Sequence, residues 1–327
     1  MALARLKTYL QWLSAQFAGE LTVASELLWG IDLGGTKIEI LVLDPSDNDV
    51  LCRQRIDTER EKGREHILDR IRLLLDNTRQ KIGIRPHQVG IATPGTLDPV
   101  TGLLKNSNTT CLNNTPLKRD LERLLDIPVT LANDANCFAL AETLMGIIPD
   151  ECPHAEVVFG IILGTGVGGG IVVDGRVITG LHGIGGEWGH MQLDPSGEDC
   201  YCGDTGCVET LISGPALERY YTRLTGKQRS LKDIAARETE DAFAAQTIGH
   251  LLTCFGRGLS QVLNVLDPDA IVIGGGVGNL DVLYGERCVE AINRGIFNHA
   301  FHGRLLRPKL GDSAGVYGAA MLVADQR

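Results

Sequence analysis

The sequence lacks an excess of basic residues. Lysine and arginine together number 31 against 41 aspartates and glutamates, which gives a net charge of −10 and an isoelectric point near 5.3. Binding to nucleic acid relies on a positive face that neutralises phosphates, and no block of Lys and Arg supplies one here. We therefore expect no nucleic-acid partner.

The sequence also lacks a long apolar run. It has no stretch of eighteen apolar residues, so we expect no membrane partner. Residues 1–28 are interrupted by Gln11, Gln16 and Glu20, which makes a poor signal peptide; we interpret them as an N-terminal extension, either an amphipathic helix or a frayed segment. Nine cysteines, an odd number, without a secretion signal indicate a cytoplasmic protein rather than a disulfide framework.

The length and the hydrophobic content of the chain are sufficient for two hydrophobic cores. The chain has 327 residues, of which 43% are hydrophobic, and this exceeds the size at which one core usually stops growing. Apolar β-rich runs alternate with segments of helical periodicity, which predicts an α/β architecture. Strands are expected at 28–33 and 38–43 and in a third run after the polar turn at 45–49, which together make a meander, and at 89–93, 129–132, 157–163, 171–173 and 270–273. Helices are expected at 64–81, 117–127, 135–146, 231–238, 242–266, 280–295 and 315–326.

Glycines are abundant, and most of them lie in short clusters after apolar runs. Two bends, DLGGTK and LGTGVGGG, each join two strands, and a third cluster follows the strand at 270–273. Glycine permits close backbone approach, so successive N–H groups can converge on a phosphate; a tight hairpin with no ligand is the alternative. The candidate phosphate-binding residues are Gly34, Gly35, Thr36, Lys37, Gly164, Thr165, Gly166, Gly168, Gly169, Gly274, Gly275 and Gly276.

The second bend also fits the pattern G-x-G-x-x-G of dinucleotide-binding proteins. That pattern requires the glycines to open a helix, whereas the residues that follow here, IVVDGRVI, indicate a strand and a hairpin. The P-loop pattern G-x-x-x-x-G-K-[ST] is absent from the sequence. Neither a Rossmann dehydrogenase nor a Walker-type enzyme is expected.

Three cysteines are packed into eight positions in CYCGDTGC, ten residues after a histidine. His190, Cys200, Cys202 and Cys207 form a Cys₃His set of the kind that binds tetrahedral zinc. The spacing is not the common C-x₂-C, so the residues alone leave three alternatives: metal ligands, buried free thiols or a disulfide. The remaining cysteines are interpreted as small apolar side chains.

With these segments in order, the chain resembles the ROK family of sugar kinases. The resemblance runs from about Trp29 to the C-terminus and rests on DLGGTK, TPG, LANDANC, LGTGVGGG, GGEWGH, CYCGDTGCVE and VIGGG. It implies a two-domain, actin-like or hexokinase-type fold with a ribonuclease-H-like core and an active site in the interdomain cleft. The implied domains are residues 29–133 plus 312–327 (small, N-terminal) and 134–311 (large, C-terminal, with the zinc loop).

The resemblance also implies roles for individual residues. Asp134 would be the general base for the sugar hydroxyl, although Asn133 or Asp134 could equally cap the helix that follows. Asp32 and the first glycine bend would face the phosphates of ATP and Mg²⁺. Asn108, Asn133, Glu187, His190 and Glu209 would bind the sugar, with Asn106 as an alternative to Asn108, and the Cys₃His set would hold a structural Zn²⁺.

The activity implied by the resemblance is ATP-dependent phosphorylation of the 6-hydroxyl of a free hexose. Several stretches favour the fructokinase and mannokinase branch, with fructose, mannose or glucose as substrate; others fit N-acetylglucosamine or N-acetylmannosamine kinases equally. A sugar-responsive regulator of the same family is the non-enzyme alternative, but only 31 residues precede Asp32, too few for a winged helix. A homodimer is expected from the resemblance alone.

Overall fold

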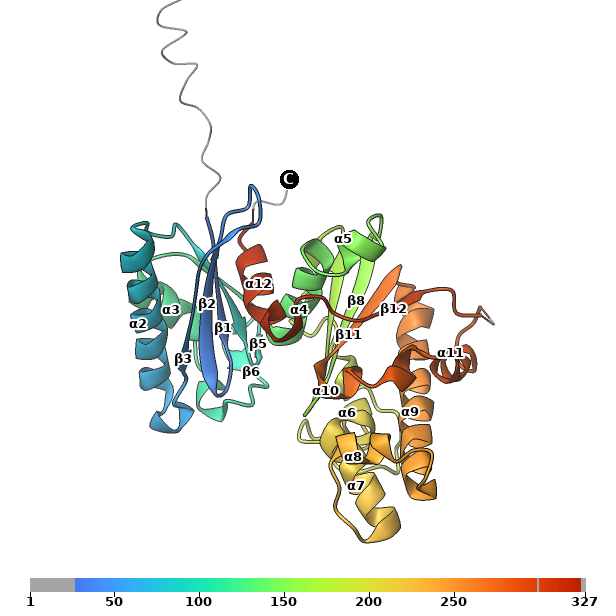
Figure 1. Cartoon of the computed structure of the whole chain (residues 1–327). Coiled ribbons are helices and arrows are strands. Elements are labelled where there is room, and N and C mark those ends of the chain that lie inside the picture. The colour runs from blue at the N-terminus through green and yellow to red at the C-terminus, as the bar shows by residue number, and fades with distance from the viewer. Residues whose placement is uncertain (1–26, 299, 325–327) are drawn as a thin grey trace, which may run out of the picture.

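The structure is a computed structural model of the chain, and residues 27–298 and 300–324 are described. The extension expected at residues 1–28 lies outside this range, except for its last two residues. The described residues form two lobes, each built on a five-stranded sheet (Figure 1). No helix in this part of the chain is long and apolar enough to cross a bilayer.

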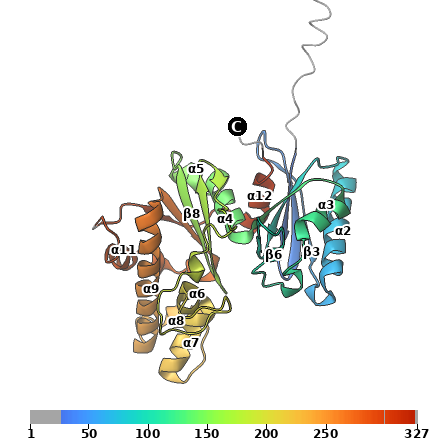
Figure 2. The same cartoon turned by 180° about the vertical axis from the view of Figure 1, so that it is seen from behind.

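The first lobe contains the sheet β3-β2-β1-β4-β7. Strands β1, β2 and β3 form an antiparallel meander, as the sequence predicts, and β4 and β7 continue the sheet in parallel with β1. Two helices cover the outer face of this sheet, and their apolar side chains make one core with it (Figure 2). The bounds are β1 Leu28–Leu33, β2 Lys37–Leu43, β3 Val50–Asp57, β4 Val89–Thr93, β7 Val129–Asn133, α2 Arg64–Ile82 and α3 Leu117–Leu125.

The second lobe repeats this plan with the sheet β10-β9-β8-β11-β12. Its first three strands are antiparallel and its last two are parallel to β8. Helices α9 and α11 pack on the outer face. The bounds are β8 Val157–Leu163, β9 Val167–Val173, β10 Arg176–Val177, β11 Ala270–Gly274, β12 Arg304–Leu306, α5 Ile148–Glu151, α6 Val208–Ile212, α7 Gly214–Thr225, α8 Leu231–Ala236, α9 Ala242–Leu266, α10 Gly275–Gly278 and α11 Glu286–Asn293.

Two helices lie side by side between the sheets and join the lobes. Helix α4 (Asp134–Leu144) follows β7, and α12 (Ala314–Met321) follows β12, so the chain passes between the lobes at both places. The helices approach so closely that a Cβ at Gly318 would lie 1.8 Å from the carbonyl oxygen of Cys137, which only glycine avoids. This contact places the N-terminus of α4 at the junction of the two lobes.

Helices α5, α6 and α7 and strand β12 were not expected from the sequence, and two of the expected helices differ from the structure. The single helix expected at 280–295 is a 3₁₀ turn, Asp281–Tyr284, followed by α11, because Gly285 is extended (φ −95°, ψ 173°) and interrupts the helix. The last helix ends at Met321 rather than at residue 326. The prediction that the glycines of LGTGVGGG open a strand is confirmed, since β9 begins at Val167.

Candidate active site

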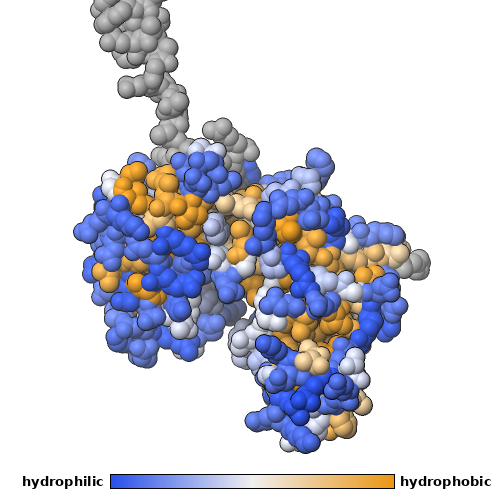
Figure 3. Space-filling view, viewed as in Figure 1, coloured by the Kyte–Doolittle hydropathy of each residue, from blue (hydrophilic) through white to orange (hydrophobic). Residues whose placement is uncertain are grey.

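Two neighbouring cavities lie where the lobes meet, and Figure 3 shows a notch between the lobes on one face. The first cavity has a volume of about 310 Å³ and is lined by both lobes: Pro94, Gly95, Thr96, Asn106, Asn108, Asn133, Asp134, Ala135, Ile162, Gly164, Thr165, Gly166, Val167, Gly168, Glu187, His190, Tyr201 and Glu209. The second has a volume of about 380 Å³ and is lined by Asp32, Asp134, Phe138, Ile162, Gly274, Gly275, Gly276, Asn279, Pro308, Gly311, Asp312, Ala314 and Gly315. Asp134 and Ile162 line both.

Asp134 is the first residue of α4. The side chain of the preceding Asn133 caps this helix by accepting a hydrogen bond from the backbone N–H of Asn136 at 2.7 Å. The structure thus assigns the capping role, which the sequence left open, to Asn133. Asp134 Oδ1 accepts only a local bond, from the N–H of Ala135 at 2.8 Å. Desolvation by the surrounding protein raises the pKa of Asp134, although the residue is open to the two cavities, so its carboxylate is a better proton acceptor than a fully hydrated aspartate.

Asp32, near the end of β1, is a half-buried carboxylate at the same junction. Burial, together with the charges of Asp134 and Glu39, raises its pKa to about 7. Glu39 itself is held by Arg53 and Arg55, whose side chains both donate to its carboxylate. Asp32 and Asp134 both line the second cavity, and carboxylate oxygens of this kind are the ligands that suit Mg²⁺.

The three glycine clusters have different surroundings. Gly34, Gly35, Thr36 and Lys37 form the β1–β2 bend and do not line either cavity. Gly164, Thr165, Gly166 and Gly168 line the first cavity, whereas Gly169 is packed inside β9, where a Cβ would lie 2.6 Å from the carbonyl oxygen of Gly186. Gly274, Gly275 and Gly276 line the second cavity, and Gly275 has φ +87°, which favours glycine.

Polar side chains form the far wall of the first cavity. Glu187 accepts from the hydroxyl of Thr96 at 3.4 Å and from the amide of Asn133 at 3.5 Å, so it joins the two lobes. Glu209 accepts from the backbone N–H of Val167 at 2.8 Å and thereby holds the second glycine bend. Burial raises the pKa of Glu187. Carboxylates in such positions are suited to accept hydrogen bonds from a polyol.

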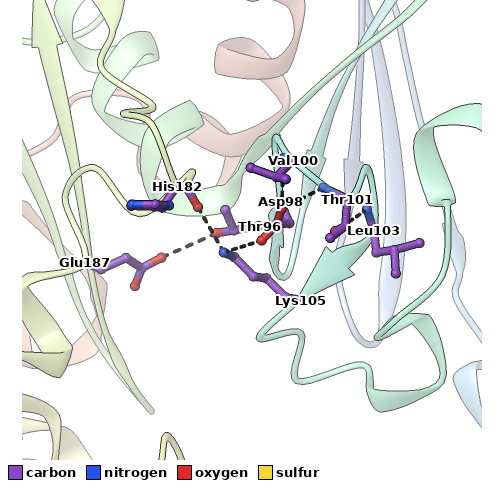
Figure 4. A network of polar contacts seen from close by, with 8 residues as sticks. All are labelled: Thr96, Asp98, Val100, Thr101, Leu103, Lys105, His182 and Glu187. Atoms are coloured by element: carbon purple, nitrogen blue, oxygen red, sulfur yellow. Dashed lines mark hydrogen bonds and ion pairs between the residues drawn. The ribbon is translucent and has the colours of Figure 1, made fainter.

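A second contact between the lobes lies beside Glu187 (Figure 4). The ammonium group of Lys105, at the end of the β5–β6 hairpin (Thr96–Leu97 and Leu104–Lys105), donates to Asp98 and to the carbonyl oxygen of His182, both at 3.0 Å. Backbone N–H donation from Thr101 and the charge of Lys105 lower the pKa of Asp98. This network fixes the hairpin against the loop that precedes Glu187.

The four residues of the Cys₃His set converge. Their ligand atoms all lie within 4.8 Å of one another, with Cys200 Sγ 3.6 Å from His190 Nδ1 and Cys202 Sγ 3.7 Å from Cys207 Sγ. Zinc–sulfur bonds of about 2.3 Å place the ligands of a tetrahedral site about 3.8 Å apart, so the distances fit zinc. The loop turns at Gly206, where a Cβ would lie 1.5 Å from the carbonyl oxygen of Asp194.

The structure also brings in residues that the sequence analysis missed. The hydroxyl of Tyr201 lies 3.0 Å from Nε2 of His190, the nitrogen that would remain free in a zinc-bound imidazole, and its ring stands edge-on to the imidazole. Thr96 reaches Glu187 as described above. In the sequence, Tyr201 stands between two cysteines and Thr96 follows the TPG turn. Their position next to these motifs was the one sequence feature that could have indicated a place in the site. Asn106 and Asn108 both line the first cavity.

Comparison with known proteins identifies the family. The ROK family matches residues 28–326. The chain belongs to the ROK family. An N-acetyl-D-glucosamine kinase of Mannheimia succiniciproducens is 36% identical over 311 residues, which cover 90% of this chain and 99% of that protein. The ROK resemblance drawn from the sequence is therefore confirmed.

Solved ROK structures share the fold. The ROK hexokinase of Thermus thermophilus is 34% identical, with a TM-score of 0.80 over 90% of this chain and 97% of that one. A ROK glucokinase of Streptomyces griseus, solved with glucose and AMPPNP, is 28% identical, with a TM-score of 0.72 over 92% of this chain and 100% of that one. The predicted hexokinase-type α/β fold is confirmed.

Proposed function

We propose that this ROK-family sugar kinase transfers the γ-phosphoryl group of ATP to the 6-hydroxyl of N-acetylglucosamine, with Asp134 as general base. One observation carries the proposal: the carboxylate of Asp134 lines both cavities. The first cavity offers the amides and carboxylates that a sugar requires. The second offers the bare glycine backbone against which a nucleotide can lie.

The proposed reaction is an in-line transfer of a phosphoryl group. A bond forms between the sugar's O6 and the γ-phosphorus, the bond from that phosphorus to the β–γ bridging oxygen breaks, and its electron pair leaves with ADP. The hydroxyl proton passes to Asp134, whose raised pKa makes its carboxylate a stronger base than an ordinary aspartate. Asn108, Asn133, Glu187, His190 and Glu209 would orient the sugar, so much of the benefit is positional.

Two metal ions fit residues of this site. Asp32 would hold Mg²⁺, which when bound offsets negative charge on the β- and γ-phosphates. His190, Cys200, Cys202 and Cys207 would hold a structural Zn²⁺, because four protein ligands leave no open position. This second ion would fix the loop between His190 and Glu209, two of the proposed sugar contacts.

Similarity to an N-acetyl-D-glucosamine kinase supports N-acetylglucosamine as the sugar. The sequence motifs placed fructose or mannose first and N-acetylglucosamine second; the relative from M. succiniciproducens supports the reverse order, since it matches over almost its whole length. An unmodified hexose is the second candidate, favoured by the similarity to the T. thermophilus hexokinase. In either case the acceptor is a 6-hydroxyl.

A panel of sugars tests the proposal. Purified protein with Mg-ATP should release ADP fastest with N-acetylglucosamine, and more slowly with fructose, mannose, glucose and N-acetylmannosamine. Faster turnover of fructose or mannose would instead support the unmodified hexose. Asp134→Ala should reduce kcat by about 10²-fold or more while ATP still binds, and near-normal turnover by this variant would remove Asp134 from its role.

A further inference from the structure

The charge of the two cavities raises a problem for a nucleotide substrate. Their lining residues include the carboxylates of Asp32, Asp134, Glu187, Glu209 and Asp312 but no lysine or arginine. A triphosphate tail is itself a polyanion, and phosphoryl transfer spreads negative charge over the transferring group. A cation from outside the cavity linings is needed beside the metal ion.

One guanidinium lies at the required place. A Cβ built on Gly35, in the first glycine bend, would be 3.2 Å from Nη1 of Arg60, 3.6 Å from Oγ1 of Thr109 and 4.0 Å from Oδ1 of Asn108. The Arg60 side chain therefore lies against the bend that follows Asp32, on the side of Gly35 that also faces Asn108, a residue of the first cavity. Asp32, three residues before Gly35, lines the second cavity, so Arg60 lies near residues of both cavities although it lines neither.

The backbone holds this segment against the glycine bend. Thr58, which is fully buried, donates from its N–H to the carbonyl oxygen of Thr36 at 2.8 Å and from its hydroxyl to that of Gly34 at 2.7 Å. Arg60 follows two residues later as the first residue of the short 3₁₀ helix Arg60–Lys62. The position of Arg60 is thus set by the bend and not by a distant surface loop.

The charge of Arg60 is not used by its neighbours. The adjacent carboxylate, Glu59, is taken by Lys62 at 2.9 Å and by His66 at 2.6 Å. Glu59 also adopts a left-handed backbone conformation, φ +52°. Within residues 27–298 and 300–324, no hydrogen bond or ion pair engages the exposed guanidinium of Arg60. An unpaired arginine beside a phosphate-type bend remains available to an anionic ligand.

We propose that Arg60 is a further catalytic residue, which contacts the γ-phosphoryl group as it passes from ATP to the sugar. This inference rests on the proposed kinase function. Arginine presents N–H donors in a planar fork that matches phosphoryl oxygens, and a cation supplied to a transferring phosphoryl group has its largest effect in the transition state. Removal of Arg60 should therefore reduce kcat far more than it weakens sugar binding.

Steady-state kinetics and nucleotide binding test Arg60→Ala, Arg60→Lys and the control Arg72→Ala, which removes an exposed arginine of α2 paired only with Asp69. We expect Arg60→Ala to lower kcat by about 10²-fold, with the sugar KM and the affinity for Mg-ADP within about twofold of wild type. Affinity for Mg-AMPPNP should fall by about tenfold. Arg60→Lys should recover part of kcat, and Arg72→Ala should match wild type.

Two results would overturn the inference. One is a kcat of Arg60→Ala within threefold of wild type; the other is an equal loss of affinity for Mg-ADP and Mg-AMPPNP, since that would place Arg60 away from the γ-phosphate. A wild-type protein that phosphorylates no sugar would refute the proposed function instead. In that case the comparison of Mg-AMPPNP with Mg-ADP still decides whether Arg60 recognises a γ-phosphate.

Discussion

Asp32 and Asp134 are two carboxylates that line one cavity, and the charge of Asp134 disfavours ionisation of Asp32. For Asp32 the pKa rises from 3.8 to about 7, first because burial removes the charge from water and second because Asp134 and Glu39 are negative. A carboxyl whose pKa is higher in the folded than in the unfolded protein destabilises the fold when it ionises. This is the arrangement expected of a site that receives a cation together with its substrate.

The protonation of Asp32 yields a prediction about stability. Below about pH 4 Asp32 is neutral in both the folded and the unfolded protein and contributes nothing; as the pH rises towards 7 the folded protein loses stability relative to an Asp32→Asn variant. The full effect corresponds to at most about 4 kcal/mol. Thermal unfolding of both proteins without Mg²⁺ from pH 4 to 8 should show the advantage of Asp32→Asn growing with pH, and a constant difference would contradict it.

At the scale of single elements, the segment from Gln192 to Cys207 in the loop of the Cys₃His set has turns and two isolated β-bridges in place of a helix or strand. Cys202 is exposed, and burial raises the pKa of Cys207 to about 12. A metal ion is the natural way to hold such a loop, because zinc sites supply folding energy outright. Elemental analysis should find one zinc per chain, lost in Cys202→Ser together with sugar affinity.

The zinc prediction has a matched control. Cys152→Ser changes a half-buried cysteine outside the cluster, so it should keep both the zinc and the sugar affinity of wild type. A zinc-free wild-type preparation with full activity would refute the structural role of the metal.

Helix α4 is tied to the second crossing segment by Glu142. This side chain is fully buried and accepts from the backbone N–H groups of Ile147, Lys309 and Leu310 at 3.0, 3.0 and 2.8 Å. Residues 309 and 310 adjoin Pro308 and Gly311, which line the second cavity. One carboxylate therefore links the helix that begins at Asp134 to the edge of the proposed nucleotide site.

Glu142→Gln should be markedly destabilising. The amide nitrogen of glutamine would face backbone donors and leave at least one of them unpaired, which corresponds to about 1–3 kcal/mol for each buried group. Chemical denaturation should report a loss of this size, and the KM for ATP should rise while the KM for the sugar stays near that of wild type. Thr143→Val, at the next position of the helix, is a control for general damage to α4. Unchanged stability of Glu142→Gln would show that the three contacts are replaceable.

The whole molecule shows why the sequence predicted the fold better than the site. Element types follow from local patterns: Ile67, Ile71, Leu74 and Leu75 recur at helical spacing and are all buried in α2. The site depends on contacts between residues far apart in the chain. No local pattern links Arg60 to Gly35, or Glu142 to Leu310, because the pairing of β2 with β3 brings the first pair together and the packing of the two crossing segments brings the second pair together. Tyr201 was missed for a local reason, because the adjacent Cys200 and Cys202 led us to interpret this stretch only as a metal site.

Two lobes joined by two crossing segments, with a polar cavity between them, form an arrangement suited to closure around ligands. The lobes already meet at Lys105 and His182 and at Thr96 and Glu187, on the sugar side. The second cavity is lined by the β11–α10 turn and by the segment before α12. We therefore expect sugar and Mg-AMPPNP together to reduce the radius of gyration in solution scattering more than either ligand alone. Asp32→Asn, which removes a charge at the junction, should reduce the response to the nucleotide but keep the response to the sugar. The homodimer expected from the family resemblance stays a prediction, and the molecular mass from the same scattering data tests it. An unchanged radius of gyration with both ligands bound would mean that the two cavities are filled without movement of the lobes.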